Sequence, residues 1–394
     1  MTPRLITGIG FANALGVGGA DALFAAMRDA EAPLPSRPLV SFDASKYANV
    51  AALEVPDFEP KKWLGDKGLR VLDRLTKLLV VAARVSLADA GLKADGAWTT
   101  SAGDRVGICC SNAYGSLEAI TELNRVAKLE DARYINPAKF PNTVANSGPG
   151  YVSIWEDLRA LNVTVSDGNC GGLDAFTCAD IFLEAQRADQ ILTGGGEAMS
   201  EALYLAFCKL GALDPTATTA ETGATNGVRL GEGAALLCLE TARSAEARGA
   251  RVLARVTGFG TSFVAPEADS SLLTFSREAT ARAIRSALDD AGVAPADVDV
   301  VSSGLCGIEA LDRTELSAID DVLGPDVAVA TPKALIGETL GAGGAMGVAV
   351  ACGWLAGVQP KPVAQGKAPE KVDTVLVTSV GYYGNTSAIV VQRA

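Results

Sequence analysis

Apolar residues along the chain follow two spacings, which predict buried strands alternating with amphipathic helices. Short apolar runs typical of strands buried on both faces occupy residues 4–10, 105–110, 191–197, 231–240, 298–301 and 375–391. Apolar residues three or four apart, which indicate helices, occupy residues 20–29, 69–91 and 312–323. This alternation predicts an α/β protein with largely buried sheets.

A weak internal repeat links the two halves of the chain. Leu87-Ala-Asp-Ala-Gly-Leu92 ends a predicted helix that leads towards a buried strand. Leu288-Asp-Asp-Ala-Gly-Val293 does the same about 200 residues later. So long a period indicates a duplicated half rather than a solenoid. We therefore predict two similar halves, residues 1–250 and 251–394.

Residues 161–188 form the central stretch of the first half. They are interpreted as a buried strand, a polar turn with Gly168, a cysteine at position 170, and a helix of small residues. A cysteine at a helix start lies near unpaired N–H groups, which lower a thiol pKa and bind anions. Cys170 is therefore the candidate nucleophile. The alternative is that Cys170, one of eight cysteines, is a small core residue.

Composition and charge narrow the classes of function. The chain of 394 residues carries a net charge of −12, which argues against nucleic acid as a partner. An acidic carrier protein would need only a local basic patch. The sequence contains no histidine, so every Ser-His or Cys-His pair and the usual zinc ligand are excluded, and we expect no metal site.

Cellular location is inferred from the cysteines and from hydropathy. The eight cysteines form no Cys-x-x-Cys pair and are interpreted as reduced thiols. No apolar run is long enough to span a bilayer, and no signal segment is visible at the start of the sequence. We therefore expect a cytoplasmic protein without a membrane span.

Five motifs in this order resemble the β-ketoacyl-acyl-carrier-protein synthases of the thiolase superfamily. They are Ile6-Thr-Gly-Ile-Gly10, Arg70-Val-Leu-Asp-Arg-Leu-Thr-Lys77, the segment around Cys170, Gly231-Glu-Gly-Ala234, and Ile336-Gly-Glu-Thr-Leu-Gly-Ala-Gly-Gly-Ala345. The resemblance covers essentially the whole chain. It implies a five-layer αβαβα fold of two similar halves. It also implies dimerisation through the strand before the cysteine, an acyl carrier protein or CoA thioester as partner, and no cofactor.

The sequence departs from this family at its two catalytic histidines. The position of the second histidine, in a Gly-His-Thr-Leu-Gly motif, is Glu338 here, and the first falls at Gly304 or Leu305. Lys333 keeps the place of the family's lysine. Losing one donor to a developing oxyanion typically costs about 2.7–4 kcal/mol. Glu338 is interpreted as a neutral acid, as the partner of Lys333, or as a satisfied polar residue.

The acyl-accepting part of the family's site has counterparts in this chain. The resemblance implies an oxyanion hole formed by the backbone N–H groups of Cys170 and of the turn 381–384, with Tyr382 as the aromatic gate. A packing role for Tyr382 is the alternative. Asn169 belongs to the cysteine turn. Val228 and Arg229 stand where the family has a phenylalanine, so we expect them to alter the substrate pocket.

Two hypotheses for function follow. In the first, which we favour, the chain is a degenerate, chain-length-factor-like subunit that pairs with an active ketosynthase in fatty-acid or polyketide-type biosynthesis. In the second, it is a Cys170-dependent acyltransferase or thioester-processing enzyme without decarboxylative condensation, in which Lys333 or Glu338 handles protons. The sequence leaves open whether the dimer is a homodimer or a heterodimer.

Overall fold

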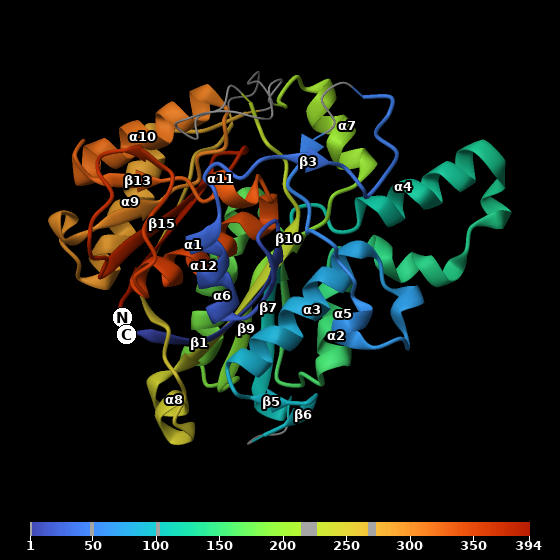
Figure 1. The fold of residues 1–394 in the computed structure, drawn as a ribbon, viewed down its shortest axis with the longest axis horizontal. Helices are drawn as coiled ribbons and strands as arrows, with labels where there is room; N and C mark the ends of the chain where they lie inside the picture. Colours follow the sequence, from blue (N-terminus) through green and yellow to red (C-terminus); the bar gives the residue numbers. More distant parts are fainter. Residues whose placement is uncertain (1, 48–50, 100–102, 214–226, 267–272) are drawn as a thin grey trace.

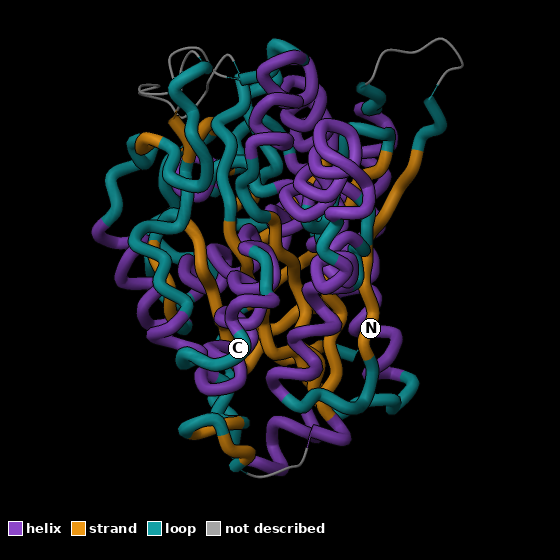
Figure 2. Tube along the Cα trace, turned by 90° about the vertical axis from the view of Figure 1, so that its right-hand side faces the viewer, coloured by secondary structure: helices purple, strands orange, loops and turns teal. Residues whose placement is uncertain are grey.

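The computed structural model describes residues 2–47, 51–99, 103–213, 227–266 and 273–394. Within these residues, one twelve-stranded sheet runs through the molecule, with helices around it (Figures 1 and 2). No helix of the described segments is long and apolar enough to cross a lipid bilayer.

The sheet consists of two halves with the same strand order. The first half contains β1 (Arg4–Asn13), β10 (Gly233–Thr241), β9 (Gln190–Glu197), β7 (Val106–Ser111) and β8 (Asn162–Val165), in that spatial order. The second half contains β11 (Ala254–Phe263), β16 (Asn385–Gln392), β15 (Thr374–Val380), β12 (Val300–Ser302) and β13 (Ala328–Ala330). Two short strands extend them: β2 (Gly16–Gly18) pairs with β1, and β14 (Val363–Gln365) pairs with β13.

Strand directions also agree between the halves. In each half the first two pairings are antiparallel and the next two are parallel. The halves join where the start of β1 pairs with the start of β11, over Arg4 to Ile6. The prediction of two similar halves is therefore confirmed. The division at residue 250 stays a prediction.

Six helices complete the five layers (Figure 1). They are α3 (Arg74–Asp89), α5 (Ser147–Glu156), α6 (Gly171–Glu184), α12 (Gly343–Leu355), α9 (Arg277–Ala291) and α10 (Glu309–Leu323). The pair α3 and α5 covers the outer face of the first half-sheet, and α9 with α10 covers that of the second. Between the half-sheets lie α6 and α12. The predicted αβαβα arrangement is confirmed.

The remaining helices connect or flank these layers. They are α1 (Ala20–Asp29), α2 (Lys61–Leu64), α4 (Leu117–Val126), α7 (Glu201–Lys209), α8 (Ala242–Arg248) and α11 (Lys333–Ile336). Two hairpin-like pairs lie outside the main sheet: β3 (Arg37–Pro38) with β4 (Ala51–Ala52), and β5 (Lys93–Ala94) with β6 (Ala97–Trp98).

The internal repeat has a physical basis at the first strand of each half. A Cβ on Gly10 would lie 1.9 Å from a carbonyl oxygen of α3, and one on Gly260 would lie 2.0 Å from a carbonyl oxygen of α9. Only glycine permits helix and strand to approach so closely. The repeated aspartate then accepts a backbone N–H just before that glycine: Asp89 from Ile9 at 2.8 Å, and Asp290 from Phe259 at 3.0 Å.

The helix predicted over 69–91 begins later than expected. Residues 69–71 form a separate short turn, and α3 starts at Arg74. Asp73 is the reason, because its side chain accepts the backbone N–H of Thr76 at 2.7 Å and so caps the helix.

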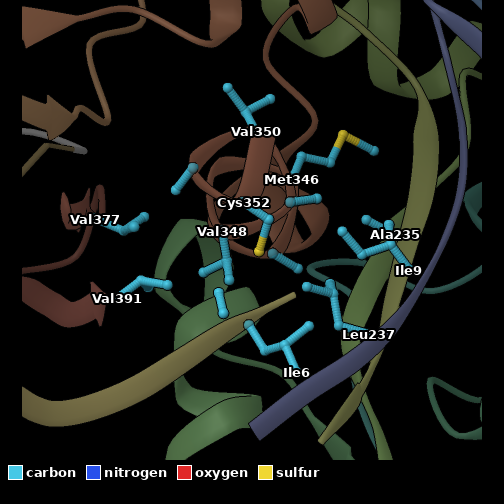
Figure 3. Close-up of a cluster of buried hydrophobic side chains, with 14 of the residues drawn as sticks. Ile6, Ile9, Ala235, Leu237, Met346, Val348, Val350, Cys352, Val377 and Val391 are labelled. Atoms are coloured by element: carbon cyan, nitrogen blue, oxygen red, sulfur yellow. The ribbon is translucent and has the colours of Figure 1, made fainter. Parts of the chain in front are cut away.

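The core centres on α12, which is buried on nearly all sides (Figure 3). Its side chains meet apolar side chains from both half-sheets, including Ile6, Ile9, Ala235, Leu237, Val377 and Val391. Glycines let the two central helices touch: a Cβ on Gly344 would lie 2.7 Å from Leu173, and one on Gly172 would lie 2.8 Å from the backbone of Ala345. The small-residue sequences of α6 and α12 therefore reflect their position between two sheets.

Candidate active site

Cys170 lies at the junction of β8 and α6, as the sequence predicts. The chain leaves β8, makes a short turn over Gly168–Cys170, and enters α6 at Gly171. Gly168 takes a positive φ of 54°, and a Cβ on Gly171 would lie 2.2 Å from the hydroxyl of Ser111. The Cys170 side chain is fully buried, and its sulfur lies 3.2 Å from the backbone oxygen of Ser379 on β15.

The expectation of a lowered Cys170 pKa is wrong. Burial raises the pKa of the thiol well above its ordinary value, and the nearby carboxyl groups of Asp174 and Asp167 raise it further. Hydrogen bonds from Ser387 act in the opposite direction without reversing the effect. The helix start lowers the pKa of the Cys170 thiol by less than burial and the two nearby carboxylates raise it.

Two N–H groups of the expected oxyanion hole already have acceptors within the chain. The backbone N–H of Cys170 donates to the carbonyl oxygen of Asp167 at 3.1 Å. The backbone N–H of Gly381 donates to the carbonyl oxygen of Asn385 at 2.8 Å. An acyl oxygen would have to displace both hydrogen bonds to use these two donors.

Lys333, the first residue of α11, and Glu338, just after this helix, form an ion pair in the interior. The ammonium nitrogen lies 2.7 Å from Glu338 Oε2 and donates to the carbonyl oxygen of Gly304 at 2.8 Å. Glu338 Oε1 accepts the backbone N–H of Leu340 at 2.8 Å. Burial alone would lower the pKa of Lys333, but the charge and hydrogen bond of Glu338, together with the charges of Cys306 and Glu315, raise the pKa above its usual value. The expected pairing of Glu338 with Lys333 is formed, and the hydrogen bonds to Lys333 and Leu340 also satisfy both carboxylate oxygens.

Gly304 stands at the end of β12, where its backbone rather than a side chain faces the site. Its N–H donates to Glu315 Oε1 at 2.8 Å. A Cβ there would come within 3.2–3.4 Å of the two Glu315 carboxylate oxygens and of the backbone nitrogen of Val380. This position holds no side-chain donor, and the space that a side chain needs is partly filled.

Sequence reasoning missed two acids on α10, the buried Glu315 and the half-buried Asp312. Glu315 accepts from Thr378 Oγ1 at 2.6 Å as well as from Gly304, and burial raises its pKa. Asp312 accepts the backbone N–H groups of Cys306 and Gly307 at 2.9 and 2.8 Å. Both lie in a sequence whose charges at helical spacing are typical of a solvent-facing helix, so no local signal distinguishes them.

Tyr382, the predicted aromatic gate, is buried, whereas its neighbour Tyr383 is exposed. Tyr382 is 8% exposed, and its hydroxyl lies 3.5 Å from Glu338 Oε2, with the side chain of Asn169 at the same hydroxyl. Tyr383 is 52% exposed, and its hydroxyl lies 3.5 Å from that of Tyr114. The exposed aromatic of this turn is therefore Tyr383, whereas Tyr382 packs inside.

Val228 and Arg229 border the same region from the chain before β10. Val228 is buried in an apolar cluster with Tyr382. The carbonyl oxygen of Arg229 accepts the backbone N–H of Glu338 at 2.8 Å, and its side chain bonds Leu34 and Ser36. Asn169, Gly304, Lys333, Glu338 and Tyr382 thus come together, with Val228 and Arg229 beside them.

A small pocket adjoins the ion pair. Its volume is about 140 Å³, and its lining includes Arg229, Cys306, Asp312, Lys333 and Glu338. The described residues include no cluster of three His, Cys, Asp or Glu side chains that could hold a metal ion. The site offers a buried thiol and a neutralised lysine–glutamate pair, but no imidazole to donate to a developing enolate.

Comparisons with known proteins agree with this architecture. Residues 4–245 match the N-terminal domain of β-ketoacyl synthases, and residues 253–362 match their C-terminal domain. A 3-oxoacyl-[acyl-carrier-protein] synthase 2 of Coxiella burnetii is 27% identical, over 99% of this chain and 98% of its own.

Two solved structures share the fold over the whole chain. The ishigamide ketosynthase/chain length factor is 28% identical with a TM-score of 0.87, covering 100% of this chain and 99% of its own. A β-ketoacyl synthase from Burkholderia phymatum is 22% identical with a TM-score of 0.85, covering 100% of both chains. The fold and these matches place the chain among thiolase-type α/β proteins. It belongs to the β-ketoacyl synthase family.

Proposed function

We propose that this chain is a non-condensing, chain-length-factor-like subunit that pairs with an active ketosynthase in fatty-acid or polyketide-type biosynthesis. The observation that carries the proposal is the Lys333–Glu338 ion pair. By the resemblance, Glu338 stands in the place of the family's second histidine. The expected place of the first histidine, Gly304 or Leu305, offers no side-chain donor either, which supports it as well.

Chemistry at the site argues against condensation by this chain alone. Malonyl decarboxylation builds negative charge on an oxygen, and a donor to that oxygen typically contributes about 2.7–4 kcal/mol. Glu338 presents carboxylate oxygens there instead, and Lys333 is already committed to Glu338 and to the Gly304 carbonyl. Two donors are thus missing, and a carboxylate stands beside the reacting region.

The edge strand β8 supports pairing with a second, similar subunit. Among the described strands, β7 is the only neighbour of β8, and the sequence of β8, Asn-Val-Thr-Val, carries no charge. Uncharged open edges invite strand pairing. On the helices α5 and α6, which pack against β8, Ile154 is 75% exposed and Ile181 is 60% exposed. An edge strand flanked by exposed apolar residues suits a partner of the same fold.

A groove beside α3 and α4 supports an acidic carrier protein as the second partner. Its volume is about 810 Å³, and it is lined by Arg70, Arg74, Lys77, Arg125 and Lys139 together with four acidic residues. Of the five cations, Arg70, Lys77 and Arg125 form no ion pair with any residue that the structure describes. Local positive charge is therefore available on a chain whose net charge is −12.

Reconstitution with a histidine-bearing ketosynthase from the same source tests this proposal. The two purified chains are mixed, and the complex is measured by size-exclusion chromatography with light scattering, followed by product analysis with a malonyl-carrier donor. We expect a one-to-one complex whose product length differs from that of the ketosynthase alone, and the Cys170→Ala variant should behave as wild type. Absence of a complex, together with condensation by this chain alone, would contradict the proposal.

A second candidate function is favoured by the cysteine turn. Cys170 retains its place at the start of α6, with its sulfur against β15. Acyl transfer through Cys170, without decarboxylation, needs no histidine at the position of Glu338. Intact-protein mass spectrometry after incubation with acyl thioesters tests this candidate. An adduct on wild type but not on Cys170→Ala supports it, and no adduct with any donor excludes it for those donors.

A further inference from the structure

The hydroxyl and the carboxyl group that lie next to Cys170 are hydrogen-bonded to each other. The Cys170 sulfur contacts the carbonyl oxygen of Ser379, and Ser379 is paired across strands β15 and β16 with Ser387. The hydroxyl of Ser387 donates to Asp174 Oδ1 at 2.6 Å. Asp174 lies on α6, one helical turn after Cys170. Cysteine, serine and aspartate therefore converge from α6 and β16.

We propose that Ser387 and Asp174 form a proton relay for Cys170, which lets the thiol exchange acyl groups with a thioester in a chain that has no histidine. This inference rests on the second candidate function. It assigns to two residues a role that the family's cysteine–histidine arrangement does not contain.

The step balances within the groups named. The Cys170 thiol passes its proton to the Ser387 oxygen while the Ser387 hydroxyl proton moves to the Asp174 carboxylate. The sulfur then attacks the acyl carbonyl, the carbonyl-to-carrier C–S bond breaks, and the carrier sulfur leaves. Asp174 returns the proton through Ser387 to the carrier thiolate. The products are an acyl-Cys170 thioester and a free carrier thiol.

The electrostatics of Asp174 suit a proton acceptor near neutral pH. Burial raises the pKa of Asp174 to about 7, and the neighbouring Asp167 adds to the rise, whereas the hydrogen bond from Ser387 opposes it. A base is most effective when its pKa lies near the working pH. Among the described residues, the ionisable groups facing Asp174 are Asp167, from the loop before the turn, and Cys170, from the turn before α6. The strand β16 contributes the Ser387 hydroxyl.

The relay can be separated from a simple charge effect. If Asp174 acts on Cys170 only as a negative neighbour, its replacement by a neutral residue favours the thiolate and speeds every reaction of the thiol. If Asp174 takes the proton, replacing Asp174 slows the reactions of the Cys170 thiol and removes the pH dependence that the ionisation of Asp174 imposes on them. The two roles predict opposite changes for one variant.

The experiment compares the full-length wild type with Asp174→Asn and Ser387→Ala. The control is Ser302→Ala, which removes another buried hydroxyl, one that donates to the Gly347 carbonyl. The first readout is the acylation rate of Cys170 by acetyl and octanoyl N-acetylcysteamine thioesters. The second is the rate of iodoacetamide labelling of Cys170 at pH values on both sides of neutrality. Both are followed by mass spectrometry of the Cys170 peptide.

We expect the wild-type rates to rise with pH towards 7 and then level off as Asp174 becomes fully ionised. Acylation at neutral pH should fall about 100-fold in Asp174→Asn and in Ser387→Ala, because general bases contribute at least this much. In both variants the rate of iodoacetamide labelling should no longer level off with pH. The control Ser302→Ala should match wild type. Faster labelling of Asp174→Asn, an unchanged Ser387→Ala, or a wild-type Cys170 that iodoacetamide never labels would each overturn the relay.

The two readouts separate the relay from the function on which it rests. In one outcome, the wild type accepts no acyl group, but its labelling rate levels off with pH, and this levelling is lost in both variants. That outcome excludes the second candidate function for these donors and retains the relay. A wild type that is acylated at the same rate as Asp174→Asn retains the function and overturns the relay.

Discussion

Lys333 Nζ and Glu338 Oε2 lie 2.7 Å apart in the interior, with the Glu338 side chain 1% exposed. The five-residue separation spans α11 and the turn after it, so the pair joins the first residue of this short helix to the segment leading into α12. The interior of this site therefore holds two opposite charges in direct contact.

Removing one partner of this pair should be strongly destabilising. Lys333→Met leaves the Glu338 carboxylate buried without its cation, which typically costs about 3–5 kcal/mol. The double variant Lys333→Met/Glu338→Leu should recover most of that loss, because an apolar replacement of both partners is often neutral. Urea unfolding followed by circular dichroism measures both free energies of unfolding. Equal losses in the single and double variants would show that the pair is not coupled.

Stability should depend on pH through Glu315. Burial raises its pKa in the folded state, so the folded chain holds this proton more tightly than the unfolded chain does. Its contribution is fully present below the ordinary glutamate pKa and is lost as pH rises through the raised value. Between mildly acidic and mildly alkaline pH, the melting temperature of Glu315→Gln should therefore fall less than that of the wild type. The exposed Glu309→Gln, on the same helix, is the control, and an identical slope in all three proteins would refute the assignment.

Two glycine-to-alanine changes should have opposite signs. In Gly260→Ala the new methyl group would lie 2.0 Å from the Ala283 carbonyl oxygen, so α9 must move from β11 and stability should fall by about 1–3 kcal/mol or more. Gly150→Ala lies within α5 with nothing near the added Cβ, and should raise stability by up to about 1 kcal/mol. Thermal unfolding of both glycine variants measures these changes in stability. An unchanged stability of Gly260→Ala would contradict the close approach of β11 to α9.

Charges beside β8 should prevent subunit pairing without unfolding the chain. Ile154→Arg and Ile181→Arg each replace an exposed apolar side chain on a helix that packs against this edge strand. We expect at least a 10-fold weaker association with a ketosynthase in sedimentation experiments, because a buried unpaired charge typically costs more than about 1.4 kcal/mol. Leu210→Arg, a change at another exposed apolar residue, should associate as wild type. Equal association of all three variants would place the interface elsewhere.

The layered fold could be predicted because its signals are local and repeated. Apolar spacing separates strands from helices, and Asp89 and Asp290 recur at equivalent helix ends. The turn at Cys170 could be located for the same reason. Glu338 could be singled out, with pairing to Lys333 among its three interpretations, because the two residues are near each other in sequence.

Features that depend on long-range packing could not be predicted. Glu315 reaches Gly304 and Thr378 only after α10 has packed onto the second half-sheet, and nothing in its own segment marks it as buried. The helix start alone predicts a lowered pKa for Cys170, whereas the burial of its thiol depends on packing against β15 and β16. The first turn of α3 was misplaced because the cap at Asp73 outweighs the apolar spacing that continues before it.

Carbon dioxide release from a malonyl carrier thioester tests the central claim most directly. The purified chain is incubated with the labelled donor, with a histidine-bearing ketosynthase as the positive control and a Cys170→Ala variant alongside. We predict no release above the rate without protein, because Glu338 and Gly304 provide no donor to the developing enolate. Release by wild type that disappears in a Glu338→Ala variant would show that this site decarboxylates malonyl groups and would contradict the non-condensing role.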